Sequence, residues 1–412
     1  MFNKLSPNFD MTAVFVLDGL ESSVEYEYRC GWFFAEAELE KVQLTKDQQI
    51  EWPAVTHRFS TANSLNNARQ SFIVGSCRYL LRLFGGYIFD DRGGKVFRSI
   101  LEQIDEKAMP VDAHLMIGDQ IYGDDLNFAA PDRRLDQFLE RYRAVFSQKY
   151  IQQLMARIPT YMILDDHEIE DNWPAKATNR DRATLYPHAI HAYQIYQCSH
   201  SPLFPAIDGR IEGTLSHFWY SFAQGCAECF VMDARTERSL SEADRRMIKN
   251  TQMSALLSWL NNGSGKVKLV VSSVLVFPDL ANDSDDKWGA FRLQRKKIID
   301  FVANNKIRKV IFVSGDVHCS FVCELRSSVD PDFRLHSVVS SSLFWPYPHT
   351  EQSDFLFGQP LAGDGAQYSS NLLSPTISTD NFARISVELN KVEVTYYERK
   401  GCLLGESTIL KF

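Results

Sequence analysis

The sequence has no apolar run long enough to cross a lipid bilayer. Its first residues, MFNKLSPNFDMTAVFVLDG, also lack twin arginines and the combination of a basic segment with a long apolar core that marks an export signal. These absences predict no transmembrane segment and, for the chain as it stands, a cytoplasmic protein. If an export signal has been removed, the expectation becomes a periplasmic or secreted protein.

Positive charge is also in short supply. The 412 residues contain 44 Lys and Arg against 52 Asp and Glu, which gives a formal net charge of −8. A surface of this sign does not coat a polyanion, so we expect no nucleic-acid polymer as a partner. A small anionic substrate remains compatible with it, because bound cations reverse the sign of the local field.

The eight cysteines lack the dense spacing of a disulfide-stabilised fold. Cys226 and Cys229 form a CAEC motif that resembles half of a zinc knuckle, but the motif runs directly into the apolar FVMD. We therefore predict that these two thiols are ordinary core or strand residues. Cys77 differs from them because polar residues surround it at the end of an apolar run.

Two patterns divide the chain, and they predict a small β unit over residues 1–64 and a main domain over residues 65–412. Apolar and polar residues alternate in MTAVFVLDGL and VEYEYRCGWFF, and HRFSTA completes the first unit. The main domain has short apolar runs of the kind found in strands covered on both faces: SFIVGSC, AHLMIGD, TYMILDD, VKLVVSS and KVIFVSGD. Helical periodicity occurs at 95–107, 135–146, 183–197, 242–262 and 293–305. This alternation predicts an α/β architecture, followed at 383–399 by two strands joined at Asn390-Lys391.

Polar side chains follow four of these predicted strands, at the point where each strand ends. They are Ser76-Cys77-Arg78, Asp119 with Tyr122, Asp165-Asp166-His167-Glu168, and Asp316 with His318. Ligands of open α/β sheets bind beyond the carboxyl ends of the strands. If the strands are parallel neighbours, these side chains converge on one rim.

Several carboxylates at one rim repel one another and raise each other's pKa unless cations hold them together. For a single Gly-Asp end, the alternative is an aspartate that caps a turn or helix. Four such ends, with Cys, Tyr and His, favour a metal site. Thiolate and phenolate are typical ligands of transition metals, iron in particular, whereas aspartates suit Ca²⁺, Mg²⁺ or Mn²⁺. The mixed set predicts two or more ions, with Asp119 as a candidate bridge between them.

The ordered motifs GSC, GDxxY, DDHE and GDVH resemble those of calcineurin-like metallophosphoesterases. Cysteine in the first motif and tyrosine in the second are similar to the alkaline phosphatase D (PhoD-like) branch. FVMDARTER and DKWGAFRLQRKKIIDFV also resemble segments of that branch. The resemblance implies a β-sandwich of two mixed sheets flanked by helices. It also implies that the small N-terminal β unit is a shortened fibronectin-like module.

Residue by residue, the resemblance implies a ferric ion held by Cys77, Asp119, Tyr122 and His318. It further implies one or more Ca²⁺ ions held by Asp119, Asp166 and Asp316, with Mn²⁺ or Zn²⁺ as alternative metals. His167 would lie beside the phosphate as an acid or as a stabiliser of the transition state, and Arg235 would bind phosphate oxygens. Asn172 either contacts the metal or phosphate, or caps the turn before Trp173-Pro174.

The implied activity is hydrolysis of a small phosphomonoester or phosphodiester, with a metal-bound hydroxide attacking phosphorus. Two alternatives are a metal-dependent hydrolase of a non-phosphate ester and a catalytically silent metal-binding protein. For Arg235 the alternative is a structural ion pair with Asp233 or Glu237, and for His167 it is a residue that only orients Asp166. We also predict that DSDD, residues 283–286, forms a solvated loop, and that SSLFWPYPH either lines a pocket or packs.

Overall fold

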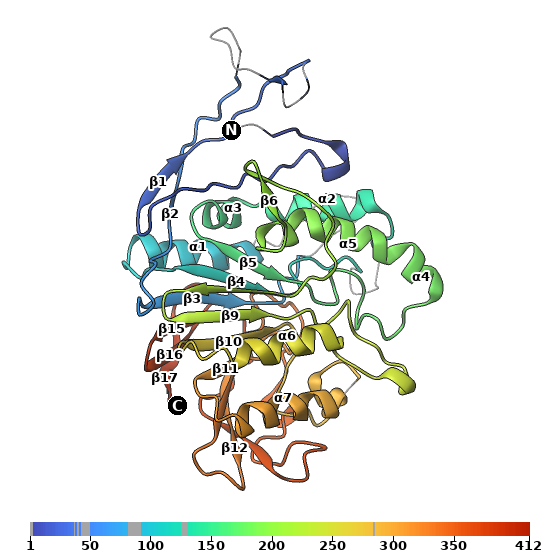
Figure 1. Ribbon diagram of the computed structural model, residues 1–412, viewed down its shortest axis with the longest axis vertical. Helices are drawn as coiled ribbons and strands as arrows, with labels where there is room; N and C mark the ends of the chain where they lie inside the picture. The colour runs from blue at the N-terminus through green and yellow to red at the C-terminus, as the bar shows by residue number, and fades with distance from the viewer. Residues whose placement is uncertain are drawn as a thin grey trace.

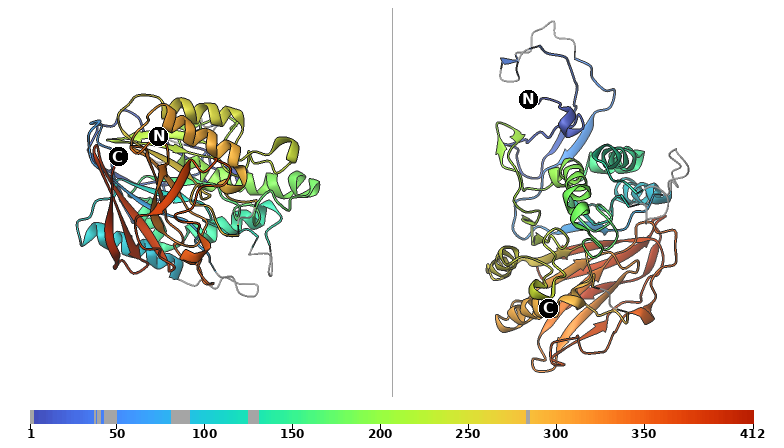
Figure 2. Two further views of the ribbon diagram at one scale, coloured as in Figure 1. Left: turned by 90° about the horizontal axis from the view of Figure 1, so that it is seen from below. Right: turned by 90° about the vertical axis from the view of Figure 1, so that its right-hand side faces the viewer.

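The computed structural model describes residues 3–36, 38, 41–42, 50–80, 92–124, 131–282 and 285–412. Two β-sheets lie face to face at its centre, with helices on both outer sides (Figure 1). The N-terminal segment lies beyond the helices of the first sheet (Figure 2). Among the described residues, no helix combines the length and the apolarity needed to cross a membrane.

The first sheet has six strands in the order β17-β16-β15-β3-β4-β5. Its parallel half is β3 (Gln70–Gly75), β4 (Ala113–Ile117) and β5 (Thr160–Ile163). Its antiparallel half is β15 (Asn381–Glu388), β16 (Lys391–Glu398) and β17 (Leu403–Leu410). The predicted tail hairpin is thus confirmed, and it extends the sheet through the β15–β3 pair.

The second sheet has seven strands in the order β14-β12-β13-β11-β10-β9-β8. Its parallel centre is β9 (Ala227–Val231), β10 (Val267–Ser272), β11 (Val310–Ser314) and β13 (Arg334–Val339). Antiparallel strands flank this centre: β8 (Tyr220–Gln224), β12 (Phe321–Ser327) and β14 (Tyr368–Leu372). The prediction of two mixed sheets is confirmed, and Cys229 is an ordinary buried strand residue.

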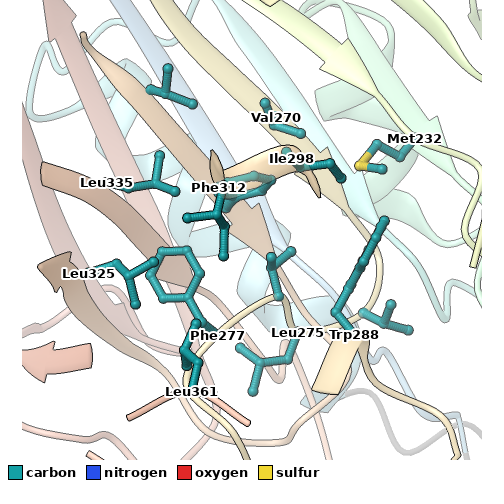
Figure 3. Packing of buried hydrophobic residues seen from close by; sticks show 14 of the residues in the cluster. Met232, Val270, Leu275, Phe277, Trp288, Ile298, Phe312, Leu325, Leu335 and Leu361 are labelled. Carbon is teal, nitrogen blue, oxygen red and sulfur yellow. The ribbon is translucent and has the colours of Figure 1, made fainter. Parts of the chain in front are cut away.

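Apolar side chains fill three layers. Between the sheets, residues such as Phe72, Leu115, Val271 and Val313 form one core. Helices α1 (Arg92–Asp105) and α3 (Lys149–Met155) cover the outer face of the first sheet. Helices α6 (Asn250–Leu260) and α7 (Arg292–Asn304) cover the second, where Trp288 and Ile298 pack near Phe312 (Figure 3). This burial of both faces explains the continuous apolar strands of the sequence.

A further helical layer lies at one end of the first sheet. It consists of α2 (Leu135–Phe146), the short α4 (Asn179–Ala183) and α5 (Leu185–Tyr196), and α2 packs against α5. The helices predicted at 95–107, 135–146, 183–197 and 293–305 are therefore confirmed within a few residues. The one predicted at 242–262 is wrong over its first half. There, Gln294 Oε1 accepts the backbone N–H groups of Met247 and Ile248, so these amides are satisfied without a helical turn.

The N-terminal unit contains less strand than predicted. Its strands β1 (Glu25–Tyr28) and β2 (His57–Ser60) form an antiparallel pair. A second small pair of described strands, β6 (Ala206–Ile207) with β7 (Arg210–Ile211), belongs to the predicted main domain. The strand expected in MTAVFVLDGL is absent, because residues 11–20 have no ladder partner and their apolar side chains remain largely exposed. The prediction that residues 1–64 form a separate unit stays a prediction.

Candidate metal centre

The four predicted strand ends meet, but they come from two sheets and not from one. Cys77, Asp119 and Asp166 follow β3, β4 and β5 of the first sheet, whereas Asp316 follows β11 of the second. The seam between them is closely bonded: the Asp316 amide donates to Ser76 Oγ at 3.3 Å, and Ser76 Oγ donates to the Ser340 carbonyl at 3.2 Å. The candidate site therefore lies where the two sheets are joined.

The glycine of each Gly-Asp motif has a steric reason. A Cβ on Gly118 would lie 2.6 Å from Asp165 Cβ, and the φ of Gly118 is +104°. A Cβ on Gly315 would lie 2.4 Å from Ser76 Oγ. Only glycine allows the ends of neighbouring strands to approach this closely, so the two glycines bring the following aspartates together.

Five residues predicted for the site have left-handed backbone conformations. The φ values are 53° at Cys77, 54° at Asp119, 56° at Asn172, 70° at Asp316 and 48° at His318. This conformation is uncommon outside glycine, and it clusters at functional sites where the surrounding structure imposes it. Five such residues at one place are an independent sign that these side chains are held in position for function.

The side chains around Asp119 form one compact cluster. Asp119 Oδ2 lies 3.4 Å from Cys77 Sγ and 3.5 Å from Tyr122 Oη. Carboxylate oxygens of Asp119, Asp165, Asp166 and Asp316 all lie within 4.8 Å of one another. The sequence analysis did not count Asp165 as a metal ligand, although it is part of the DDHE motif.

His318 joins this cluster through the backbone and through Ser341. Its amide donates to Ser341 Oγ at 3.0 Å, and that hydroxyl lies 3.2 Å from Cys77 Sγ. The imidazole stacks on the Trp345 ring, with 3.8 Å between the ring centroids. Trp345 is half-buried and Tyr347 is 39% exposed, so whether SSLFWPYPH lines a pocket or packs stays open.

The chemistry of these side chains fits metal ions. Asp119 Oδ1, Asp165 Oδ2 and His318 Nε2 are buried and have no hydrogen-bond partner among the described residues. Buried polar atoms of this kind are rare in folded proteins, because each unsatisfied group costs about 1–3 kcal/mol. Cations bound by the thiol, phenol, carboxylate and imidazole groups would satisfy these atoms.

The pKa values show that burial, together with neighbouring negative groups, opposes ionisation of these side chains. Burial raises the pKa of the Cys77 thiol to about 12, and Asp316 adds to the shift. Burial also raises the pKa of Asp165 to about 8, against the opposing effect of Arg235, and it holds the pKa of Asp119 well above its usual range. A bound cation would reverse these shifts, because it stabilises the ionised ligands.

Arg235 lies beneath the cluster and is fully buried. Its guanidinium donates to Asp165 and to Asp286, and it lies 3.4 Å from Asp166 Oδ1. The alternative that named Asp233 or Glu237 as its ion-pair partner is wrong. Asp233 instead accepts the backbone N–H of Arg235 at 3.1 Å, which turns the side chain toward β5. Contact between Arg235 and a phosphate stays a prediction.

His167 and Asn172 both lie beside the carboxylates. His167 Nδ1 is 3.0 Å from Asp124 Oδ1, and its ring centroid is 4.3 Å from that of Tyr122. Although burial opposes protonation, Asp166 and Asp124 raise the pKa of His167 well above 6.5. Asn172 donates its backbone N–H to Asp166 Oδ2 at 2.6 Å. The catalytic and substrate-binding roles of both residues stay predictions.

Sequence reasoning missed two acidic residues of the centre. Asp124 holds His167, and Asp286 accepts from Arg235 and Arg238. The DSDD segment was expected to be a solvated loop, which is wrong for Asp286, because this residue is buried among three cationic side chains. Its position two residues before Trp288, in the segment resembling the PhoD-like branch, was the available signal.

A two-sheet sandwich with a cluster of carboxylate, thiol, phenol and imidazole groups at its seam belongs to the class of metallophosphoesterase folds. Comparison with solved structures supports this class. The chain matches the structure of PhoD with a TM-score of 0.65 and 15% identity, over 96% of this chain and 75% of that one. It matches the purple acid phosphatase PPD1 from yellow lupin (Lupinus luteus) seeds with a TM-score of 0.56 and 12% identity, over 96% and 61%.

Residues 81–394 match the PhoD-like phosphatase family model, and the chain belongs to that family. It is also 22% identical over 214 residues to alkaline phosphatase D of Bacillus subtilis (strain 168). That match covers 46% of this chain and 36% of the relative, so the chain spans about a third of the length of this curated protein.

Proposed function

We propose that this protein is a metal-dependent phosphoesterase that hydrolyses small phosphomonoesters or phosphodiesters. The observation that carries the proposal is the convergence, in a member of the PhoD-like phosphatase family, of four aspartates within 4.8 Å of one another. A thiol and a phenol lie beside them, and buried oxygens among them have no hydrogen-bond partner in the described part of the chain.

Cys77, Asp119, Tyr122 and His318 would hold a ferric ion, and Asp119, Asp166 and Asp316 would hold one or more Ca²⁺ ions, with Mn²⁺ or Zn²⁺ as alternatives. When bound, such cations neutralise phosphate oxygens and acidify a coordinated water. The donor set supports this division, because the soft thiol of Cys77 and the phenol of Tyr122 lie 3.4 and 3.5 Å from the same oxygen, Asp119 Oδ2.

The side chains around the ligands have separate tasks in this proposal. His167, held at Nδ1 by Asp124, would donate a proton to the leaving oxygen. Arg235 would act through the carboxylates that it contacts, because its buried guanidinium fixes Asp165 and Asp286. Asn172 would support Asp166 through its backbone N–H, while its side-chain Nδ2, which donates to Asp171 Oδ1 at 2.8 Å, would have a second N–H for a phosphate oxygen.

The proposal is tested with purified protein whose metal content has been measured by elemental analysis. We expect hydrolysis of aryl phosphate mono- or diesters that stops on chelation and returns when metal is added. An aryl carboxylate ester tests the alternative of a non-phosphate esterase. If metal is bound but no phosphate ester is hydrolysed under any metal supplement, the phosphoesterase proposal is overturned and the silent metal-binding alternative stands.

A further inference from the structure

Lys287 lies inside the carboxylate cluster, at the residue before the short 3-10 helix Trp288–Phe291. Its Nζ donates to Asp286 Oδ2 at 2.6 Å and makes a second, shorter contact with Asp316 Oδ2. The ammonium group thus connects Asp286 to Asp316, a candidate metal ligand that follows β11. The side chain is 14% exposed, so Lys287 reaches the rim, whereas Arg235 does not.

Charge balance around Lys287 limits the number of cations that the cluster needs. With all of them ionised, four carboxylates lie on this side of the centre: Asp165, Asp166, Asp286 and Asp316. Three cationic side chains, Arg235, Arg238 and Lys287, contact them. Lys287 thus neutralises part of the negative charge that metal ions would otherwise balance at Asp286 and Asp316.

The geometry places Lys287 in competition with a further ion. A metal ion bound at Asp316 Oδ2 would share this oxygen with the ammonium group, and Arg235 Nη2 also lies 3.5 Å from the same oxygen. The positive charges of the metal ion and of these two side chains would repel one another at such short range. The ammonium group and a metal ion therefore exclude each other at this oxygen.

We propose that the ammonium group of Lys287 is a resident cation of this centre and takes the place of one divalent metal ion. The inference rests on the metal-binding part of the proposed function and not on the reaction. The chain then binds one divalent ion fewer than its carboxylates would hold without Lys287. Lys287 fixes Oδ2 of Asp316, and the other carboxylate oxygen of Asp316 stays available to the remaining divalent ion.

Calcium binding to the full chain, stripped of metal by a chelator and then dialysed, tests the proposal. We compare the wild type with Lys287→Met, which keeps the length of the side chain without its charge, and with Lys287→Arg, which keeps the charge. Lys296→Met is the matched control, because Lys296 also pairs with an aspartate, Asp300, but lies on α7. Equilibrium dialysis is expected to show one additional Ca²⁺ per chain for Lys287→Met and none for the other variants. Equal Ca²⁺ stoichiometry in the wild type and Lys287→Met overturns the proposal.

A second measurement needs no variant of the centre. Reductive methylation followed by mass spectrometry reports how accessible the Lys287 amine is in the wild type, with the exposed Lys297 as the internal reference. If Lys287 is a resident cation, Ca²⁺ leaves its low reactivity unchanged. If a metal ion displaces the ammonium group, Ca²⁺ raises the reactivity of Lys287 severalfold relative to Lys297, and the proposal is overturned.

Phosphate-ester assays on the same samples separate this inference from the proposed function. Metal-dependent hydrolysis by a wild type whose Lys287 becomes reactive with Ca²⁺ removes the inference and leaves the phosphoesterase standing. An additional Ca²⁺ site in Lys287→Met, in a protein that hydrolyses no phosphate ester, removes the phosphoesterase and leaves the inference standing.

Discussion

Cys77, Asp119, Asp316 and His318 each occupy a left-handed backbone conformation that costs a non-glycine residue about 1–3 kcal/mol. The bonds that impose it come from the backbone and from neighbouring side chains. For example, the Cys77 amide donates to the Gly118 carbonyl, and the Asp316 amide donates to Ser76 Oγ. Substitutions that preserve side-chain shape therefore leave the placement intact and test the chemistry of each group alone.

Asp119 is the candidate bridge, because it lies beside Cys77 and Tyr122 and also belongs to the group of four aspartates. We predict that Asp119→Asn lowers the metal content and reduces hydrolysis by on the order of 10²-fold or more, since an amide cannot neutralise two cations. Elemental analysis and an aryl phosphate assay measure both effects. Asp136→Asn, on the exposed side of α2, serves as the control. Full metal content with most of the turnover in Asp119→Asn would remove this residue from the centre.

Cys77 tests the identity of the first metal. A thiol whose pKa is raised to about 12 by burial becomes a thiolate only when a cation is bound to it. We predict that Cys77→Ser loses or exchanges iron while the fold is kept, and that the visible colour from thiolate and phenolate ligation disappears or shifts. Cys226→Ser, at a buried thiol that donates to the Val387 carbonyl, should change neither property. A colourless, iron-free and active wild type contradicts the ferric assignment only.

His167 is expected to act on the leaving group. Its proton is held by Asp124 and Asp166, and general acids contribute about 10²–10⁴-fold to rates. We predict that His167→Gln keeps its metal content and loses more kcat/KM on phosphate esters with poor leaving groups than on those with good ones. His188→Gln on α5 is the control. Loss of metal in His167→Gln would instead identify His167 as a ligand or as the residue that orients Asp166.

At the scale of elements, the sequence predicts those strands and helices whose burial gives the apolar residues a regular pattern. Strands covered on both faces, such as β10 and β11, read as unbroken apolar runs, and α2 reads as a helical stripe with the bounds that the structure has. The antiparallel strands β12, β14 and β17 went unpredicted. Two of them are partly exposed, so their patterns are mixed, and strand pairing is set by neighbours distant in sequence.

The same difference between regular and irregular segments separates the predicted residues of the candidate site from those that were missed. The strand ends carrying Cys77, Asp119, Asp166 and Asp316 were predictable, because each apolar run stops at a polar cluster. Asp124 and Asp286 lie in irregular segments without periodicity, and only the fold brings them to the cluster. That the four ends belong to two sheets was likewise unpredictable from strand order alone.

His114 of β4 provides a pH test at this scale. Its ring is fully buried, both ring nitrogens lack hydrogen-bond partners among the described residues, and burial lowers its pKa to about 3. The unfolded chain binds this proton near pH 6.5, so the neutral ring stabilises the fold above that pH, and the stabilisation is lost as the pH falls. We expect the free energy of unfolding to contain about 2 kcal/mol less from this residue at pH 5 than at pH 7.

Denaturant unfolding of metal-free wild type and His114→Leu at both pH values measures this contribution. The free energy of unfolding of the wild type, relative to that of His114→Leu, should be about 2 kcal/mol lower at pH 5 than at pH 7. His188→Leu is the control, because His188 is partly exposed on α5 and its Nδ1 lies 3.1 Å from the Arg133 carbonyl oxygen. An equal pH dependence in wild type and His114→Leu would show that His114 is hydrated in the folded state.

For the whole molecule, the candidate metal centre lies where the two sheets meet, at one end of the apolar core between them. Its ligands follow β3, β4 and β5 on one side and β11 on the other, and the Ser76 hydroxyl already connects the sheets at this seam. Only the folded chain brings these ligands together, so only the folded chain can bind ions there. Metal binding should therefore be coupled to the stability of both sheets together.

We predict that chelation lowers the melting temperature of the whole chain by several degrees and that added metal restores it. An ion present at 100 times its Kd stabilises the folded state by about 2.7 kcal/mol, because it binds the unfolded chain far more weakly. Differential scanning calorimetry over a series of metal concentrations measures the shift. The shift should be smaller in Asp119→Asn, because Asp119 is the candidate bridge between the ions. A melting temperature independent of metal, in a protein shown to bind it, would mean that the sheets hold their relative position without the ions. The centre would then be a preformed cavity, set by the strained strand ends and by Arg235.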